Sequence, residues 1–168
     1  MGYYTQQIVT EKGSEAIART VAKQSTLTFT SIKTGAGKYS IYEISKLSSV
    51  TELKDEKQIF DINSISSNEN TIQLTSILTN VGVTESYEIC EIGLFAKEND
   101  GEEFLVAISL NAENPALMPV FDKVPIEMQV GDYLTVSNSE NFNIQYKSAA
   151  YFSTSPIVWL NSSMVTYA

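Results

Sequence analysis

Residues 86–110 have the sequence SYEICEIGLFAKENDGEEFLVAISL, which indicates the fold class most directly. Two apolar runs, Ser86–Lys97 and Glu103–Leu110, flank a polar segment that contains Asp100-Gly101. Asp-Gly suits the central positions of a hairpin turn, where φ is positive. The second run has an apolar side chain at every even position from 104 to 110, which predicts a strand with one buried face. The segment therefore predicts an antiparallel β-hairpin.

Further strands are predicted on both sides of this hairpin, because β-branched and aromatic residues alternate with Ser, Thr and Asn. Residues 58–65 and 71–78 are expected to pair across a polar turn at 66–70. Three more strands are predicted, over 27–35 (ending at Gly35-Ala36-Gly37), 124–136 and 142–146. A loop with a helical turn at 50–54 and a long loop over 111–121 are also predicted.

One helix is predicted, over about residues 10–24. Thr10 is a suitable N-cap, Gly13 is a weak position early in the helix, and Ala16, Ile17 and Val21 have helical spacing. The expected fold class is α+β, mainly antiparallel β-sheet or sandwich with one N-terminal helix. The length of 168 residues fits one domain with an appendage.

The composition excludes several functional classes. The chain has no histidine, one cysteine (Cys90) and one arginine (Arg19), so it has no Ser-His-Asp triad, no internal disulfide and no Cys-x-x-Cys metal site. The net charge of −9 disfavours nucleic acid and anionic membranes as partners. No apolar run reaches the length of a membrane span, and residues 1–7 lack signal-peptide features, so synthesis in a host cytoplasm is expected.

Three motifs that could carry chemistry do not fit their templates. The Gly35–Ser40 stretch lacks the earlier glycine and the later Ser or Thr of a phosphate-binding loop, so a turn is predicted. The acidic residues 98–103 do not have the spacing of a calcium loop. Glu85, Glu88 and Glu91 fall on both faces of one predicted strand, and Cys90 is expected in the core. We therefore predict no catalytic residue, no cofactor and no metal ligand.

Several stretches in the same order along the chain carry a resemblance to a known family: Thr10–Ala18, Leu27–Gly37, Phe60–Ile65, Asn70–Leu74, Ile89–Ala96 and Phe104–Ile108. They resemble the N-terminal domain of the tail fibre, or tail-collar fibre, proteins of contractile-tailed phages and phage-tail-like bacteriocins. The most specific piece, Ile89–Ala96, is similar to the family's Arg-Glu-Ile-Gly-Leu-Phe, with Cys90 in place of the arginine. Ala36 stands where the family usually has Asp.

The resemblance implies a structural, non-enzymatic role. It implies a domain over 1–146 that attaches a fibre to baseplate proteins of the tail. Such fibres are usually homotrimers, and the expected location is the virion or bacteriocin particle. A distal fibre or receptor-binding protein is a further expected partner. No shaft repeat or tip follows within these 168 residues, so a short fibre, a connector or the base of a longer fibre is expected.

The segment 147–168 changes character, because it carries no charged side chain after Lys147 and is rich in apolar and aromatic residues. Such a segment either packs on its own sheet or is covered by a partner. We expect an interface or the start of a fibre shaft here, buried around a threefold axis. The residues predicted for the partner or oligomer interface are Tyr3, Tyr4, Tyr151, Phe152, Ile157, Trp159 and Leu160.

Two other functions compete with fibre attachment. A receptor- or carbohydrate-binding protein would use exposed aromatic rings such as Tyr39, Tyr42, Tyr151 and Trp159. An enzyme that degrades surface glycans would need a pair of carboxylates in a cleft. The sequence favours the attachment role.

Overall fold

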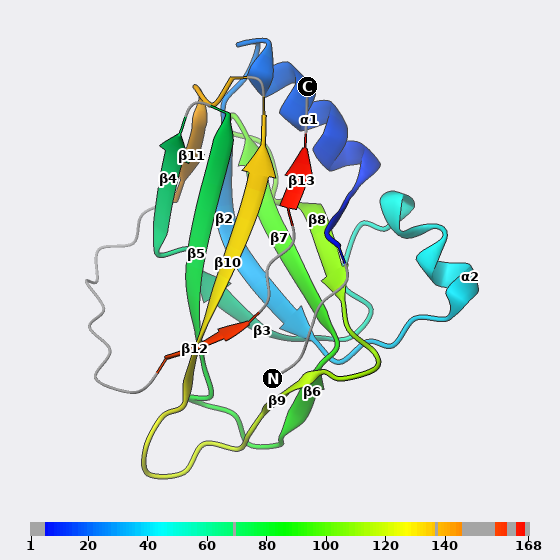
Figure 1. The fold of residues 1–168 in the computed structure, drawn as a ribbon, viewed down its shortest axis with the longest axis vertical. Coiled ribbons are helices and arrows are strands. Elements are labelled where there is room, and N and C mark those ends of the chain that lie inside the picture. Colours follow the sequence, from blue (N-terminus) through cyan, green and yellow to red (C-terminus); the bar gives the residue numbers. More distant parts are fainter. Residues whose placement is uncertain (1–5, 69, 137, 146–156, 161–163, 167–168) are drawn as a thin grey trace.

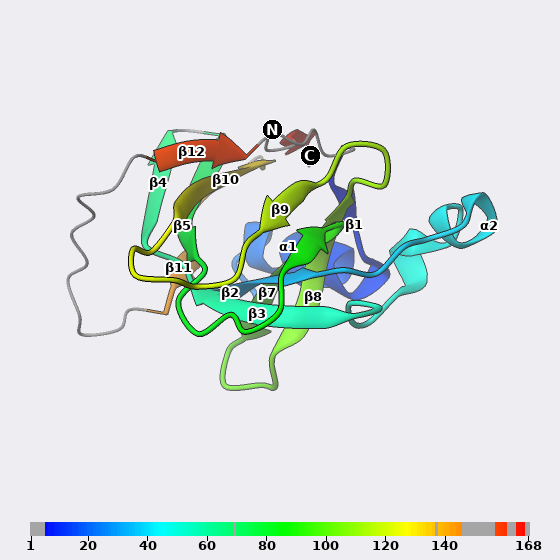
Figure 2. The ribbon, with the colours of Figure 1, turned by 90° about the horizontal axis from the view of Figure 1, so that it is seen from below.

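The computed structural model describes residues 6–68, 70–136, 138–145, 157–160 and 164–166. These residues form two β-sheets around one hydrophobic core, with a helix at one end and a two-stranded ribbon at the other (Figure 1, Figure 2). The predicted class, mainly antiparallel α+β, is confirmed. The elements are β1 Ile8–Val9, α1 Glu11–Val21, β2 Leu27–Gly35, α2 Ile41–Ile44, η1 Leu47–Ser49, β3 Glu56–Asp61, β4 Ser64–Asn68, β5 Thr71–Thr79, β6 Tyr87–Ile89, β7 Glu91–Glu98, β8 Phe104–Leu110, β9 Ala116–Met118, β10 Glu127–Thr135, β11 Phe142–Ile144, β12 Ile157–Leu160 and β13 Met164–Thr166.

The first sheet has the order β1-β8-β7-β2-β11. Two short strands share one edge of β2: β11 pairs with its first residues, 27–29, and β3 pairs with residues 31–35. The second has the order β12-β10-β5-β4, with β13 also on β10. Most pairs are antiparallel, but β11 pairs with β2 in parallel, as do β12 and β13 with β10. Side chains from both sheets, such as Phe29, Leu94 and Leu74, meet in the core.

Two β-bulges change which residues face the core. In β2, Thr30 is an extra residue between the Phe29–Ala96 and Ser31–Phe95 pairs, so Ile32 joins Phe29 in the core. Regular strand alternation would place Ile32 on the opposite face from Phe29, and the bulge reverses that.

The second bulge lies in β8, where Val106 has no partner between the Leu94–Ala107 and Phe95–Leu105 pairs. Val106 faces the main core, but Ile108 faces a smaller cluster on the other side of the sheet. The prediction that this strand buries only one face is therefore wrong, because both of its faces are covered and all seven residues are buried.

The bulge is tied to the start of α1. Thr10 caps the helix, as predicted, because its Oγ1 accepts a hydrogen bond from the Gly13 N–H at 2.9 Å. The same hydroxyl donates to the Leu105 carbonyl at 2.7 Å, and the Thr10 N–H donates to the Val106 carbonyl. The helix ends at Val21 rather than residue 24, and Lys23 has a φ of 62°, which is incompatible with a continuing helix.

Gly13→Ala should destabilise the protein, although alanine is normally the better helix residue. A Cβ at position 13 would lie 2.3 Å from the Val106 carbonyl oxygen, which is fixed backbone. We expect a loss of about 1–3 kcal/mol in the free energy of unfolding, measured by urea titration. The matched control is Ala18→Gly on the exposed helix face, which should cost only about 0.5–1 kcal/mol. A Gly13→Ala protein as stable as wild type would mean that the helix does not pack this closely.

Two predicted strands are each divided between sheets. The predicted strand over 58–65 is interrupted at Ile62-Asn63, so that β3 pairs with β2 and β4 pairs with β5. Only the second part forms the predicted hairpin. The predicted strand Ser86–Lys97 is interrupted at Cys90: β6 pairs with β9, and β7 lies in the first sheet.

Two predicted connections also differ from the structure. The helical turns after β2 come earlier than predicted, in α2 and η1, and no helix covers residues 50–54. The loop predicted over 111–121 contains the short strand β9, which pairs with β6. The hairpin between β7 and β8 is confirmed, although the positive φ, 52°, belongs to Asn99 rather than to Asp100 or Gly101.

Candidate attachment surfaces

An arm, residues 36–55, leaves the first sheet after β2 and returns to it at β3. It carries α2 and η1 and projects from the body of the molecule (Figure 1, Figure 2). Leu47 and Leu53 attach the arm to the first sheet, because both are buried in the smaller apolar cluster with Phe95 and Ile108. The arm therefore has a small core of its own beneath it.

The base of the arm is fixed by one buried carboxylate, Glu91. Its Oε1 accepts hydrogen bonds from the N–H groups of Gly37 (3.1 Å) and Asp55 (2.8 Å). Its Oε2 accepts from the Lys54 N–H (3.0 Å) and the Tyr39 hydroxyl (2.6 Å). Burial raises the pKa of Tyr39, and its hydrogen bond to Glu91 raises that pKa further. One side chain thus joins both ends of the arm to β7.

The glycines of the Gly35-Ala36-Gly37 loop make room for that carboxylate. A Cβ at Gly35 would lie 2.4 Å from Glu91 Oε1, and a Cβ at Gly37 would lie 2.5 Å from it. The loop that superficially suggests phosphate binding therefore surrounds an internal carboxylate.

The tip of the arm is a knob, which we define as Ile41, Tyr42 and Ile44. Their exposed fractions are 89%, 70% and 46%. The helix that bears them is held by a capping box, in which the Ser40 side chain accepts from the Glu43 N–H and the Glu43 carboxylate accepts from the Ser40 N–H.

Lys54, near the C-terminal end of the arm, contacts the short helix that carries the knob. Lys54 Nζ lies 2.8 Å from Glu43 Oε1 and donates to the Lys38 carbonyl at 2.8 Å. The hydrogen bond from Lys54 lowers the pKa of Glu43. Lys46 Nζ lies 4.2 Å from the centre of the Tyr42 ring and donates to its hydroxyl. The knob is thus an apolar tip on a fixed support.

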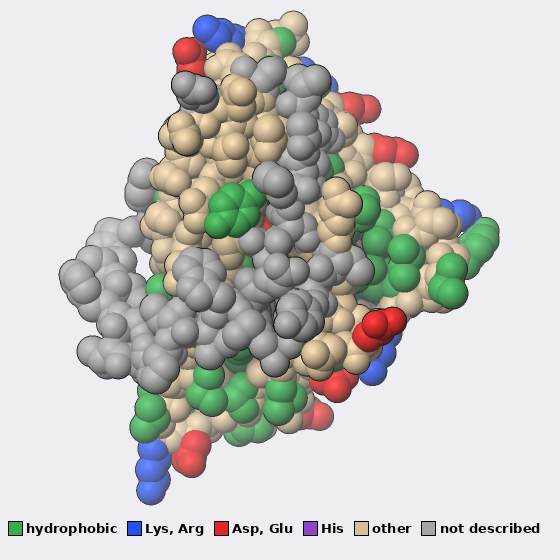
Figure 3. Space-filling view, in the orientation of Figure 1, with side chains coloured by type: hydrophobic (Ala, Val, Ile, Leu, Met, Phe, Trp, Pro, Cys, Tyr) green, Lys and Arg blue, Asp and Glu red, His purple; other side chains and the backbone are tan. Residues whose placement is uncertain are grey.

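A second exposed apolar surface lies at the end of the molecule that carries β6 and β9. Six large side chains with exposed fractions from 40% to 70% make up this end patch, and they gather at the bottom of the view in Figure 3. They belong to the β5–β6 loop, to β9 and to the β9–β10 loop. The end patch consists of Val81, Leu117, Val120, Phe121, Val124 and Ile126.

Buried Asn80 holds the two loops of the end patch together. Its Oδ1 accepts from the Ile126 N–H at 2.8 Å, and its Nδ2 donates to the Val120 carbonyl at 3.2 Å. The Phe121 N–H also donates to the Val83 carbonyl. The end patch is therefore a fixed surface, like the knob.

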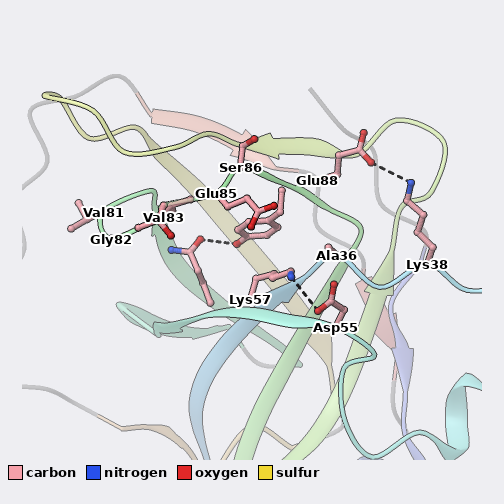
Figure 4. A pocket seen from close by; sticks show the side chains of 13 residues that line it. Ala36, Lys38, Asp55, Lys57, Val81, Gly82, Val83, Glu85, Ser86 and Glu88 are labelled. Atoms are coloured by element: carbon pink, nitrogen blue, oxygen red, sulfur yellow. Dashed lines mark hydrogen bonds and ion pairs between the residues drawn. The ribbon is translucent and has the colours of Figure 1, made fainter.

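A pocket of about 580 Å³ lies between the end patch and the base of the arm (Figure 4). Four of its five charged side chains form ion pairs: Lys38 Nζ lies 3.4 Å from Glu88, and Lys57 Nζ lies 3.3 Å from Asp55. Tyr87 lines the inner wall and donates to Gln58 Oε1, and burial raises its pKa to about 12. The two ion pairs cancel, and Glu85 leaves the lining with a net charge of −1, so the pocket has no concentrated charge of one sign.

The residues that the sequence suggested for chemistry do not come together. Glu91 lies under the arm, whereas Glu88 is exposed and pairs with Lys38. Cys90 is buried, as predicted, and burial raises its pKa. Within the described residues there is no group of three metal-ligating side chains, and no described helix is long and apolar enough to cross a membrane.

Three of the seven predicted interface residues lie within the residues that the structure describes. Tyr3, Tyr4, Tyr151 and Phe152 lie outside the described residues. The other three belong to β12, whose backbone pairs in parallel with β10, in the register Glu127–Ile157, Gln129–Trp159 and Val130–Leu160.

Sequence reasoning missed the knob and the end patch. The capping-box pair Ser40 and Glu43, three residues apart, would have located α2. The end patch has no local signal, because its residues come from segments about 40 positions apart that Asn80 joins.

Comparison with known proteins gives one match. The family model for the phage tail-collar fibre protein, N-terminal, matches residues 1–145. Searches of curated proteins and of solved structures gave no match. The matched range includes α1, the arm, the end patch and both sheets through β11. The chain therefore belongs to the phage tail-collar fibre family, through its N-terminal domain, and is a structural part of a phage tail fibre.

Proposed function

We propose that this chain attaches a tail fibre to the baseplate of a contractile tail, as a homotrimer. The observation that carries the proposal is the match of a tail-collar fibre N-terminal domain to residues 1–145. The two fixed apolar surfaces support it, because exposed apolar patches of this kind mark protein–protein contacts. The segment 147–168 then continues toward the fibre shaft or adds to the interface.

Carbohydrate binding is less well supported by the described aromatic residues. Lys46 covers the Tyr42 ring at 4.2 Å, and Lys54 lies 5.2 Å from the centre of the Tyr39 ring. Stacking of a sugar on the ring face that the lysine occupies would require displacement of that lysine.

The test is a direct comparison of the two kinds of partner. The full chain should have the mass of three 18.6 kDa chains in solution and should bind baseplate proteins of the same tail in a pull-down. It should give no signal on a glycan array above that of an unrelated acidic protein. Glycan binding without baseplate binding would contradict the proposal and support direct host recognition.

A further inference from the structure

Residues 6–9, which precede α1, contact both sheets. β1 pairs with the outer edge of β8, in the first sheet, at Ile8 and Val9 (Figure 2). Just before β1, the Gln7 side chain reaches the second sheet, where its Nε2 donates to Asp132 Oδ1 in β10 at 3.1 Å. Both side chains are buried, with 4% of each residue exposed. The segment is therefore held to one sheet by two strand pairs and to the other by a buried polar pair.

Asp132 lies in the apolar, core-facing row of β10. Its neighbours in that row and the residue opposite it in β5 are apolar and buried: Val130, Leu134 and Leu74. The strands β1, β5, β8, β12 and β13 contain no titratable residue, and the charged residues of α1 are all exposed. The other titratable residues of β10, Glu127 and Tyr133, alternate onto the opposite face of the strand. The strands that flank β10 therefore offer no cation to an Asp132 carboxylate.

The amide of Gln7 bears on the protonation state of this carboxyl group. Gln7 Oε1 is buried, and none of the residues that the structure describes donates to it. A carboxylate has only acceptor atoms, whereas a neutral carboxylic acid carries one O–H donor. A neutral Asp132 that accepts from Nε2 at one oxygen can donate to Oε1 from the other, which satisfies both halves of the amide. Ionisation removes that donor and leaves a buried charge without a partner, which is costly.

Residues 6–9 are the most weakly held segment beside this pair. β5 pairs with β10 along nine residues, and β12 and β13 pair with it along four and three, whereas β1 has only two paired residues. Ile8 is already 37% exposed. The weakly held segment ends at Thr10, whose hydroxyl and N–H both donate to carbonyl groups of β8. Separation of residues 6–9 would therefore let water reach Asp132 while the longer strands stay paired.

We propose that Gln7 and a neutral Asp132 form an amide–acid pair that acts as a pH-sensitive latch, which holds residues 6–9 closed while Asp132 is protonated and releases them when it ionises. The proton passes to solvent. Opening also uncovers the outer edge of β8 at Ala107 and Ile108, which β1 otherwise covers. An uncovered strand edge can pair with another strand. The latch thus withholds this edge in acid and makes it available at higher pH.

Native-state hydrogen exchange of the full chain tests the latch. Exchange rates at the amides of residues 6–9 are divided by those of an unstructured peptide at the same pH, which gives the ratio of open to closed forms. Burial raises the pKa of Asp132 from 3.8 to about 7, so this ratio should rise about tenfold per pH unit, on the order of 1,000-fold between about pH 4 and pH 7, and then level off. Low concentrations of urea should not change it, because local opening exposes little surface, but should accelerate exchange in β7.

Two substitutions and a control assign the effect to the pair. Asp132→Asn keeps a donor for Gln7 Oε1 but cannot ionise, so the open fraction should be the same at about pH 4 and pH 7. Gln7→Met removes both halves of the amide with little change in volume, and should raise the open fraction about tenfold at about pH 5. Gln6→Met, at the exposed neighbouring position, is the matched control and should exchange like wild type.

Three results would each overturn the latch. The first is an open fraction at residues 6–9 that does not change between about pH 4 and pH 7, or a change that Asp132→Asn retains. The second is the same urea dependence at residues 6–9 as in β7, because the segment then opens only with the whole domain. The third is equal exchange in Gln7→Met and Gln6→Met. If Asp132→Asn does not fold, the wild-type pH series and the Gln7 variant still decide.

Discussion

Replacing Glu91 with alanine is expected to lower the free energy of unfolding by about 2–4 kcal/mol, because a buried donor left without its acceptor costs about 1–3 kcal/mol. The buried Gly37 N–H and the partly buried Asp55 N–H lose their Glu91 acceptor, whereas the Lys54 N–H keeps a bond to the Tyr39 hydroxyl. The effect should be measured by urea unfolding. Hydrogen exchange should show loss of protection at the Gly37 and Asp55 amides before global unfolding, since they hold the arm to β7.

The matched control for Glu91 is Glu88→Ala, three residues earlier in the sequence. Glu88 is exposed and its ion pair with Lys38 is solvated, so the change should alter stability by less than about 0.5 kcal/mol. Glu91→Gln keeps one acceptor oxygen and should fall between the two. Equal stability of Glu91→Ala and Glu88→Ala would contradict the assignment of Glu91 as the anchor of the arm.

The buried pair Gln7 and Asp132 should make stability fall as pH rises. Gln7 precedes β1, Asp132 lies in β10, and Gln7 Nε2 donates to Asp132 Oδ1 at 3.1 Å, so the pair joins the two sheets. Burial raises the pKa of Asp132 to about 7. The folded state therefore binds a proton between about pH 4 and pH 7 that the unfolded state has released. Stability from this group is greatest below about pH 4 and decreases until about pH 7.

Asp132→Asn removes that titration and isolates it from other carboxylates. The variant should be more stable than wild type above pH 7, by an amount on the order of 4 kcal/mol, and the difference should shrink to near zero at about pH 4. Within the described residues, Gln7 Oε1 is buried without a hydrogen-bond partner, and the amide of an asparagine could donate to it. Denaturant unfolding across this pH range measures the difference.

Asp100→Asn provides the control for the pH experiment, because Asp100 is an exposed residue at the tip of the β7–β8 hairpin. We expect this substitution at an exposed position to change the free energy of unfolding by less than about 0.5 kcal/mol. If the Asp132→Asn curve runs parallel to that of wild type, Asp132 is not held protonated by burial.

The sequence predicted the elements whose signals are local. Thr10 starts α1 because an N-cap depends on its own neighbours, and the polar residues 98–101 form the hairpin turn for the same reason. The hairpin predicted around residues 66–70 forms between β4 and β5, although residues 66–68 belong to β4 rather than to the turn.

The sequence did not predict features that depend on distant partners. The break at Cys90 is invisible locally, because apolar residues continue through both halves of the run. The bulge at Val106 lies where Thr10, about 95 positions away in the sequence, donates to the Leu105 and Val106 carbonyl groups. Gln7 and Asp132 are 125 positions apart, and neither carries a sign of the other in its own neighbourhood.

Cross-linking mass spectrometry of assembled tail particles tests the central claim most directly. If this domain attaches the fibre, exposed lysines such as Lys38, Lys46 and Lys123 should cross-link to baseplate proteins and to other copies of the same chain. Cross-links from these lysines only to proteins at the distal end of the fibre, with none to the baseplate, would contradict the attachment role.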